Sequence, residues 1–291
     1  MINVLLAIVF CVAIPVLVMA SFVPSLERSA PRQDNYRGRP VFVGLGVVWF
    51  VWLISFWVGA HILAMLHITQ PAWVTYLLPL FPLVAGTCVF GLVDDWLGSR
   101  ETLGFGGHLR ALAHGRITTG GLKFLGIGLL SVFTAVSLYY AGASTILHVV
   151  LVAAVLALSA NLLNLFDLRP VRASKVYLLL LVVACVCIVV VGVVRLEVGD
   201  VAALVLAALG PVLAVWRFDA GERGMLGDVG ANSMGVLIGY LFATALPFWG
   251  LVACVVILLA LNLASERVSF TQVIENNKVL KAGDMLGRIK E

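Results

Sequence analysis

The chain has 291 residues, of which 62% are hydrophobic and only 12% are charged, and its mean hydropathy is +1.09. Soluble domains carry about 25% charged residues, so the composition excludes a soluble globular protein and indicates an integral membrane protein. The net charge of +4 requires no nucleic-acid partner, because membrane topology accounts for where the basic residues lie.

Nine apolar segments are long enough to cross a bilayer as helices, which takes about 17–25 mostly apolar residues. In chain order they are Ile2–Ala20, Val41–Ala64, Ala72–Val93, Leu122–Ala141, Thr145–Phe166, Val176–Val194, Val201–Trp216, Val229–Leu246 and Trp249–Ala264. The predicted fold is therefore all-α and polytopic. A single membrane domain spans residues 1–264, and a tail follows over residues 265–291.

The basic residues predict the orientation. Of the 19 Lys and Arg residues, all but Arg195 fall after the first, third, fifth, seventh or ninth span. Loops rich in Lys and Arg stay in the cytoplasm. We therefore expect an outside N-terminus and a cytoplasmic tail, in a plasma membrane of the bacterial type.

Polar residues gather at the same predicted edge. They are Asp94 and Asp95 at the end of the third span, Asn161, Asn164 and Asp167 at the end of the fifth, and Asp228 at the start of the eighth. A helix dipole favours an acid at the N-terminus, which explains Asp228 alone. The other acids need a positive partner, and the spacing of three between Asn161, Asn164 and Asp167 predicts one shared helix face.

Such a cluster suits phosphoryl transfer assisted by Mg²⁺, with Mn²⁺ as an alternative. Magnesium takes oxygen ligands and is held by one or two carboxylates plus substrate phosphates. We expect Asp94, Asp95 and Asp228 to form the catalytic and metal-binding set. Arginines in neighbouring loops can hold diphosphate oxygens, and the candidates are Arg37, Arg100 and Arg169.

Four motifs in order resemble one known family. They are "NYRGRPVFVGLG" (residues 35–46), "GLVDDW" (91–96), "NLLNLFD" (161–167) and "MLGDVGANSMG" (225–235). Together they resemble the polyprenyl-phosphate N-acetylhexosamine-1-phosphate transferases, a family that includes phospho-N-acetylmuramoyl-pentapeptide transferase and the enzymes that start teichoic acid and O-antigen synthesis. The resemblance covers most of the chain from residue 35 to 240.

The resemblance implies a reaction and its partners. A UDP-linked amino sugar would donate its sugar 1-phosphate to polyprenyl (undecaprenyl) phosphate and release UMP, which starts a cell-envelope glycan. Asp228 would be a principal Mg²⁺ ligand, and Asp94 or Asp95 would act on the lipid phosphate or support the metal. Asn164 and Asp167 would lie in the nucleotide and diphosphate region, and Arg37 would bind phosphate. Direct attack and a covalent aspartyl intermediate both remain open, as does a homodimer.

The sequence also departs from the family. Pro170 replaces a second acid after Asp167, and Met225 replaces an aromatic residue associated with base stacking. The end of the chain has no histidine-rich segment, which favours an N-acetylhexosamine donor over a peptide-bearing sugar. The tail from Phe270 to Leu286 is only partly helical in period, so both an interfacial helix and a lid are open.

Three other functions predict different features of the sequence. A transporter places ionisable residues near the midplane and often has inverted repeats, whereas no acid lies inside a predicted span here and we find no repeat. A CDP-alcohol phosphotransferase would carry an Asp-Gly-x-x-Ala-Arg signature, which is absent. An inactive relative that binds lipid phosphate remains as the alternative, on account of Pro170 and Met225.

Overall fold

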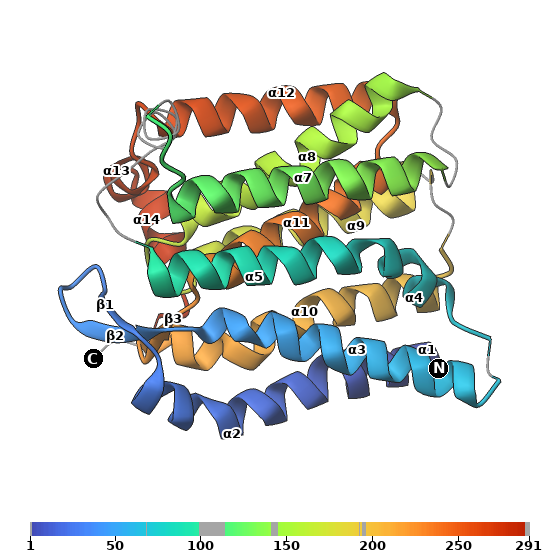
Figure 1. The fold of residues 1–291 in the computed structure, drawn as a ribbon, viewed down its shortest axis with the longest axis horizontal. Helices are drawn as coiled ribbons and strands as arrows, with labels where there is room; N and C mark the ends of the chain where they lie inside the picture. Colours follow the sequence, from blue (N-terminus) through green and yellow to red (C-terminus); the bar gives the residue numbers. More distant parts are fainter. Residues whose placement is uncertain are drawn as a thin grey trace.

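The structure is a computed structural model that describes residues 2–67, 69–98, 114–140, 145–191, 193 and 196–288. It confirms an all-α, multi-pass membrane protein (Figure 1). Within the described residues, eight helices are long and apolar enough to cross a membrane. They run side by side.

The first span consists of α1 (Ile2–Leu6), a π-helical segment (Ala7–Ala13) and α2 (Ile14–Ser29). The other elements of the bundle are α3 (Val48–Met65), α4 (Ala72–Leu77), α5 (Phe81–Leu97), α7 (Thr119–Tyr140), α8 (Ile146–Phe166), α9 (Arg172–Val191), α10 (Val198–Ala220), α11 (Gly227–Ala245) and α12 (Phe248–Ser265). Two short helices, α13 (Phe270–Asn276) and α14 (Lys278–Met285), follow in the tail.

Several predicted spans were too short. The first helix continues to Ser29, which puts Arg28 in its last turn, and α10 continues to Ala220, which places Asp219 inside a helix. The apolar run ends where the hydrocarbon ends, but a helix can continue into the interface. Acids therefore do occur inside the helices, although Asp94, Asp95 and Asp219 lie in or next to a last turn rather than near the midplane.

The eighth predicted segment, Val229–Leu246, is α11, which is less apolar than the eight helices counted as spanning. It packs against α5, α8 and α9, and most of its residues are buried. A helix enclosed by other helices meets little lipid, so its sequence tolerates Asn232, Ser233 and several glycines. In contrast, α12 lies at the edge of the bundle and buries only Leu251 and Leu258.

The close contact between α8 and α11 depends on Gly235. A Cβ atom at this position would overlap the α8 backbone and lie 2.7 Å from the carbonyl carbon of Ser159. Small residues let membrane helices approach closely. Gly235 thus sets how near α11 lies to α8.

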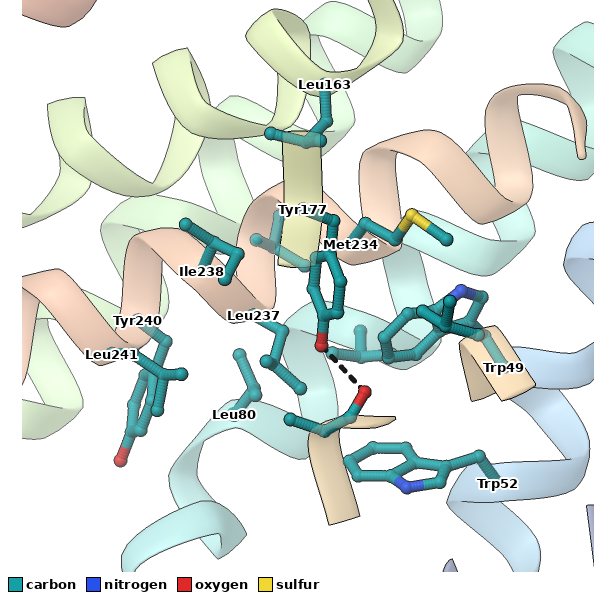
Figure 2. Packing of buried hydrophobic residues seen from close by; sticks show 14 of the residues in the cluster. Trp49, Trp52, Leu80, Leu163, Tyr177, Met234, Leu237, Ile238, Tyr240 and Leu241 are labelled. Carbon is teal, nitrogen blue, oxygen red and sulfur yellow. Dashed lines mark hydrogen bonds between the residues drawn. The ribbon is translucent and has the colours of Figure 1, made fainter. Parts of the chain in front are cut away.

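Buried polar side chains in the core bond to the α10 backbone (Figure 2). Pro211 lies inside α10 and has no N–H, so the carbonyl of Ala207 lacks its usual helical donor. The Trp52 indole N–H donates to that carbonyl at 2.9 Å, and the Tyr177 hydroxyl donates to the carbonyl of Ala208 at 2.8 Å. The aromatic side chains of α3 and α9 therefore satisfy the backbone around the proline.

A three-stranded sheet, which was not predicted, lies at one end of the bundle, called here the sheet end. Strands β1 (Arg32–Asp34) and β2 (Pro40–Val43) are antiparallel, and β3 (Gly224–Met225) runs parallel to β2. The register pairs Phe42 with Gly224 and Val43 with Met225. The sheet thereby holds the chain before α3 against the chain before α11, and these segments carry the first and fourth motifs.

Candidate functional site

A cavity of about 710 Å³ opens at the sheet end. This volume lies within the range of small-molecule sites, roughly 300–1,000 Å³. We call it the polar cavity, because its lining includes seven carboxylates, from Asp34, Asp94, Asp95, Asp167, Asp219, Glu222 and Asp228. The wall also includes Asn164, Arg169 and residues of the β1–β2 hairpin.

Two of these acids satisfy the N-terminus of α11. The first N–H groups of a helix have no partner within the helix, and they attract negative charge. The Asp95 carboxylate accepts the N–H groups of Asp228 at 2.8 Å and Val229 at 3.1 Å, while Asp167 accepts that of Gly227 at 3.1 Å. Asp95 and Asp167 sit at the ends of their own helices, where the dipole is unfavourable, and the α11 N-terminus offsets that cost.

Gly227 makes this arrangement possible. Its φ is +72°, and a Cβ atom there would lie 2.6 Å from the Asp95 carboxylate. Glycine adopts positive φ without steric cost. The glycine of the fourth motif therefore allows the Asp95 side chain to reach the helix N-terminus.

The other two motif acids share a cation. The ammonium of Lys123, in the first turn of α7, forms ion pairs with Asp94 at 2.7 Å and with Asp228. All three side chains are between 15% and 19% exposed, so the pairs are mostly buried, and the Asp94 and Asp228 carboxylates line the cavity. Two carboxylates and one ammonium leave a net negative charge, which attracts a further cation.

The structure brings most of the predicted site residues together, and among the described ones Asn161 and Arg37 are the exceptions. Asn164, Asp167 and Arg169 line the polar cavity with the Asp pair and Asp228. Asn161 instead turns toward α12, where its amide donates to Asn262 at 2.6 Å, so it is not part of the cavity wall. The helix ends at Phe166 and Asp167 lies beyond it, so the predicted common face does not form.

Two of the predicted arginines are not among the described residues that form the cavity wall. Arg37 lies at the tip of the hairpin, where it pairs with Glu222 at 3.1 Å, on the rim of the cavity rather than in its wall. Arg100 lies outside the described residues.

Sequence reasoning missed several residues of the site. The sequence places Lys123 among the cytoplasmic basic residues without a role, although a single Lys near the start of a long apolar helix is a signal that could have found it. Asp219 lines the cavity from the last turn of α10, Glu222 lines it from the turn between α10 and β3, and Tyr36 lines it from the hairpin. No spacing rule relates these positions to the motif acids, because they meet only through the fold.

Burial raises the pKa of the Asp167 carboxyl well above its usual range, and the negative charges of Asp219, Asp95 and Asp228 raise it further. The hydrogen bond from Gly227 opposes this shift without overcoming it. A carboxyl of this kind gains a proton at a higher pH than an ordinary aspartate, which makes the local charge of the cavity dependent on pH.

No preformed metal cage exists in the described part of the chain, where no three His, Cys, Asp or Glu side chains gather as ligands. Magnesium does not need one, because it takes one or two carboxylates and completes its shell with water and phosphate. Asp94 and Asp228 have the right oxygen donors and already share one cation. Asp95 is less suited, because both of its oxygens accept backbone N–H groups.

Comparisons with known proteins gave no match: no protein-family model fits the sequence, and no curated protein matches it. The case for a function therefore depends on the motifs and on the geometry of the polar cavity.

Proposed function

We propose that this protein is a membrane enzyme that transfers a sugar 1-phosphate from a UDP-linked N-acetylhexosamine to polyprenyl phosphate. The observation that carries the proposal is the Asp94, Lys123 and Asp228 centre at the sheet end. A long-chain lipid phosphate keeps its head group at the membrane interface, so the reacting groups must lie at helix ends. In the proposed orientation the polar cavity faces the cytoplasm, where nucleotide sugars are available.

The residues of the polar cavity would have different roles in binding the metal and the substrates. Asp94 and Asp228 would hold Mg²⁺, which when bound neutralises phosphate charge and orients the diphosphate. Lys123 would hold phosphate oxygens beside these carboxylates, and Arg169 would hold the diphosphate at the cavity mouth. Asn164 and Asp167 would contact the nucleotide side of the donor.

In the overall reaction, a new bond joins the lipid phosphate to the phosphorus that carries the sugar. The bond between that phosphorus and the UMP phosphate breaks, and UMP leaves with the electron pair. Neither an oxidant nor a reductant is required. Because little covalent chemistry falls to the protein, positioning and charge neutralisation would supply most of the catalysis.

The test is release of UMP by purified protein given undecaprenyl phosphate, Mg²⁺ and a panel of UDP-sugars. We expect one donor to be used, and we expect Asp94→Asn, Asp228→Asn and Lys123→Met each to lower the rate by about a hundredfold or more, as is common when one electrostatic group of an active site is removed. The matched control is Asp200→Asn, an acid in the first turn of α10 that accepts a hydrogen bond from Asn3 far from the cavity.

The control variant should keep the wild-type rate. If folded wild-type protein releases no UMP with any donor but still binds the lipid phosphate, the transferase proposal fails and the inactive-relative alternative takes its place.

A further inference from the structure

The turn between α8 and α9 forms one wall of the polar cavity and has a strained backbone. Val171 adopts a φ of +53° although its side chain is β-branched and buried. Such a conformation is costly and persists only where the surroundings impose it. One constraint is the carboxylate of Asp219, which accepts the Val171 N–H at 2.9 Å.

A second constraint comes from the tail. Arg172, which is only 3% exposed, donates two parallel hydrogen bonds to Asp284 of α14, at 2.8 and 2.9 Å. The remaining guanidinium nitrogen of Arg172, Nη1, donates to the Thr271 hydroxyl at 2.8 Å. Paired guanidinium and carboxylate groups of this geometry are strong and directional. Burial raises the pKa of Asp284, but its hydrogen bonds with Arg172 and the positive charges of Arg172, Arg288 and Lys175 together outweigh burial and hold that pKa below its usual range.

Further contacts from the tail reach the same turn. Lys175, in the first turn of α9, donates to the backbone carbonyls of Gly283 and Leu286 at 3.1 Å each. Arg169, which lines the cavity, pairs with Glu275 of α13 at 3.1 Å. Phe270 stacks on Phe166 just before the turn, with ring centroids 5.0 Å apart. The tail therefore contacts the turn before, within and after the strained valine.

Ordinary packing does not explain these contacts. Neither α13 nor α14, both fully described, contains a buried residue. Val279 and Leu286 are 79% and 72% exposed, so the tail adds little to the apolar core. Its polar bonds are instead concentrated on residues 169–175.

We propose that the C-terminal segment Phe270–Arg288 is a strap that holds the Asp167–Arg172 turn in its strained form, and that Asp284 and Arg172 are positioning residues for donor binding. Asp284 touches no reacting atom; it acts through Arg172 on the placement of Asp167 and Arg169 in the cavity wall. The role in donor binding rests on the function proposed above, whereas the hold on the turn does not.

The experiment compares full-length Asp284→Asn with wild type. The matched control is Lys281→Gln, an exposed residue on the same short helix. Hydrogen exchange measured by mass spectrometry reports on the turn without reference to any activity. We expect Asp284→Asn to speed exchange in peptides that cover residues 167–175, including the Val171 amide, and to leave the spanning helices unchanged. Lys281→Gln should exchange like wild type.

The second readout is steady-state kinetics with the donor found in the UMP assay. We expect the donor KM to rise by roughly tenfold, the effect of losing a charge-assisted hydrogen bond, with kcat and the KM for the lipid nearly unchanged. Asp284→Glu, which keeps the charge, should recover part of the loss.

The two readouts separate the possible failures. Unchanged exchange in the turn overturns the strap, and so does faster exchange throughout the bundle, which would mean a merely structural role. Faster exchange in the turn with an unchanged donor KM overturns the positioning role. Faster exchange confined to the turn, in a protein whose wild type releases no UMP, supports the strap while it defeats the proposed function.

Discussion

Asp94 and Asp95 are adjacent in the sequence but bond to different partners. Neighbouring positions on a helix point about 100° apart, so one carboxylate meets Lys123 of α7 and the other meets the N-terminus of α11. The repulsion between the two carboxylates is offset, because an ammonium neutralises one charge and a helix dipole stabilises the other. The two acids therefore have separate tasks, which the repeated letter in the sequence does not reveal.

This division predicts different effects on stability. Asp95→Asn should lower the free energy of unfolding by roughly 1–3 kcal/mol, since an amide cannot accept both N–H groups and one buried donor is left unsatisfied. Asp94→Asn should cost less, because Lys123 keeps its pair with Asp228. Thermal unfolding of both variants in the same detergent tests this. An equal or larger loss in Asp94→Asn would contradict the assignment.

The raised pKa of Asp167 predicts a pH dependence with a definite sign. The pKa of Asp167 in the folded state lies above the ordinary value of about 3.9. The contribution of the protonated Asp167 carboxyl to the free energy of unfolding is therefore complete below a pH of about 3.9. It is lost as the pH rises through the raised folded value. We expect the unfolding midpoint of wild type to fall over this window, and that of Asp167→Asn to fall less, in buffer without divalent ions. If the unfolding midpoints of the two proteins change equally with pH, the prediction is wrong.

At the scale of elements, the approach of α11 to its neighbours places the site. The N-terminus of α11 can meet carboxylates from α5 and from the end of α8 only if the three helices pack closely. The small sheet adds a second constraint, because β3 leads into α11 and pairs with β2. The strands have two to four residues each, too few for an alternating pattern to stand out in a sequence.

Gly235→Ala tests the contact between α8 and α11. The added methyl group would overlap the α8 backbone, so we expect a loss of about 1–3 kcal/mol in the free energy of unfolding. Gly128→Ala is the control, since a Cβ atom there has no neighbour within 4 Å. In that open helical position alanine should be neutral or slightly stabilising. Equal effects of the two substitutions in thermal unfolding would refute the close contact.

At the scale of the whole molecule, the sheet and the tail lie at one end of the bundle (Figure 1), and residues of that end line the polar cavity. All the basic residues but Arg195 were assigned to that side from the sequence. A one-sided site is what a reaction between a soluble nucleotide sugar and a membrane lipid requires. It also agrees with the positions of the acids near helix ends.

The orientation itself can be measured. Fusion of a fluorescent protein to the C-terminus should give fluorescent cells, because the reporter folds in the cytoplasm, and fusion of alkaline phosphatase there should be inactive. Insertion of the same reporters between α3 and α4, at the opposite end, should reverse the pattern. The reverse result at both positions would mean that the cavity faces outward.

The sequence alone determined the fold class, the approximate spans and the four motif acids that meet, because apolar length and short motifs are local properties of the chain. It could not determine where α2 and α10 end, that Asn161 turns toward α12, or that α11 runs through the middle of the bundle. It also could not assign Lys123, Asp219 or the tail to the site. Those facts depend on contacts between residues such as Arg172 and Asp284, far apart in the chain, and only the packed helices decide which partner each buried charge finds.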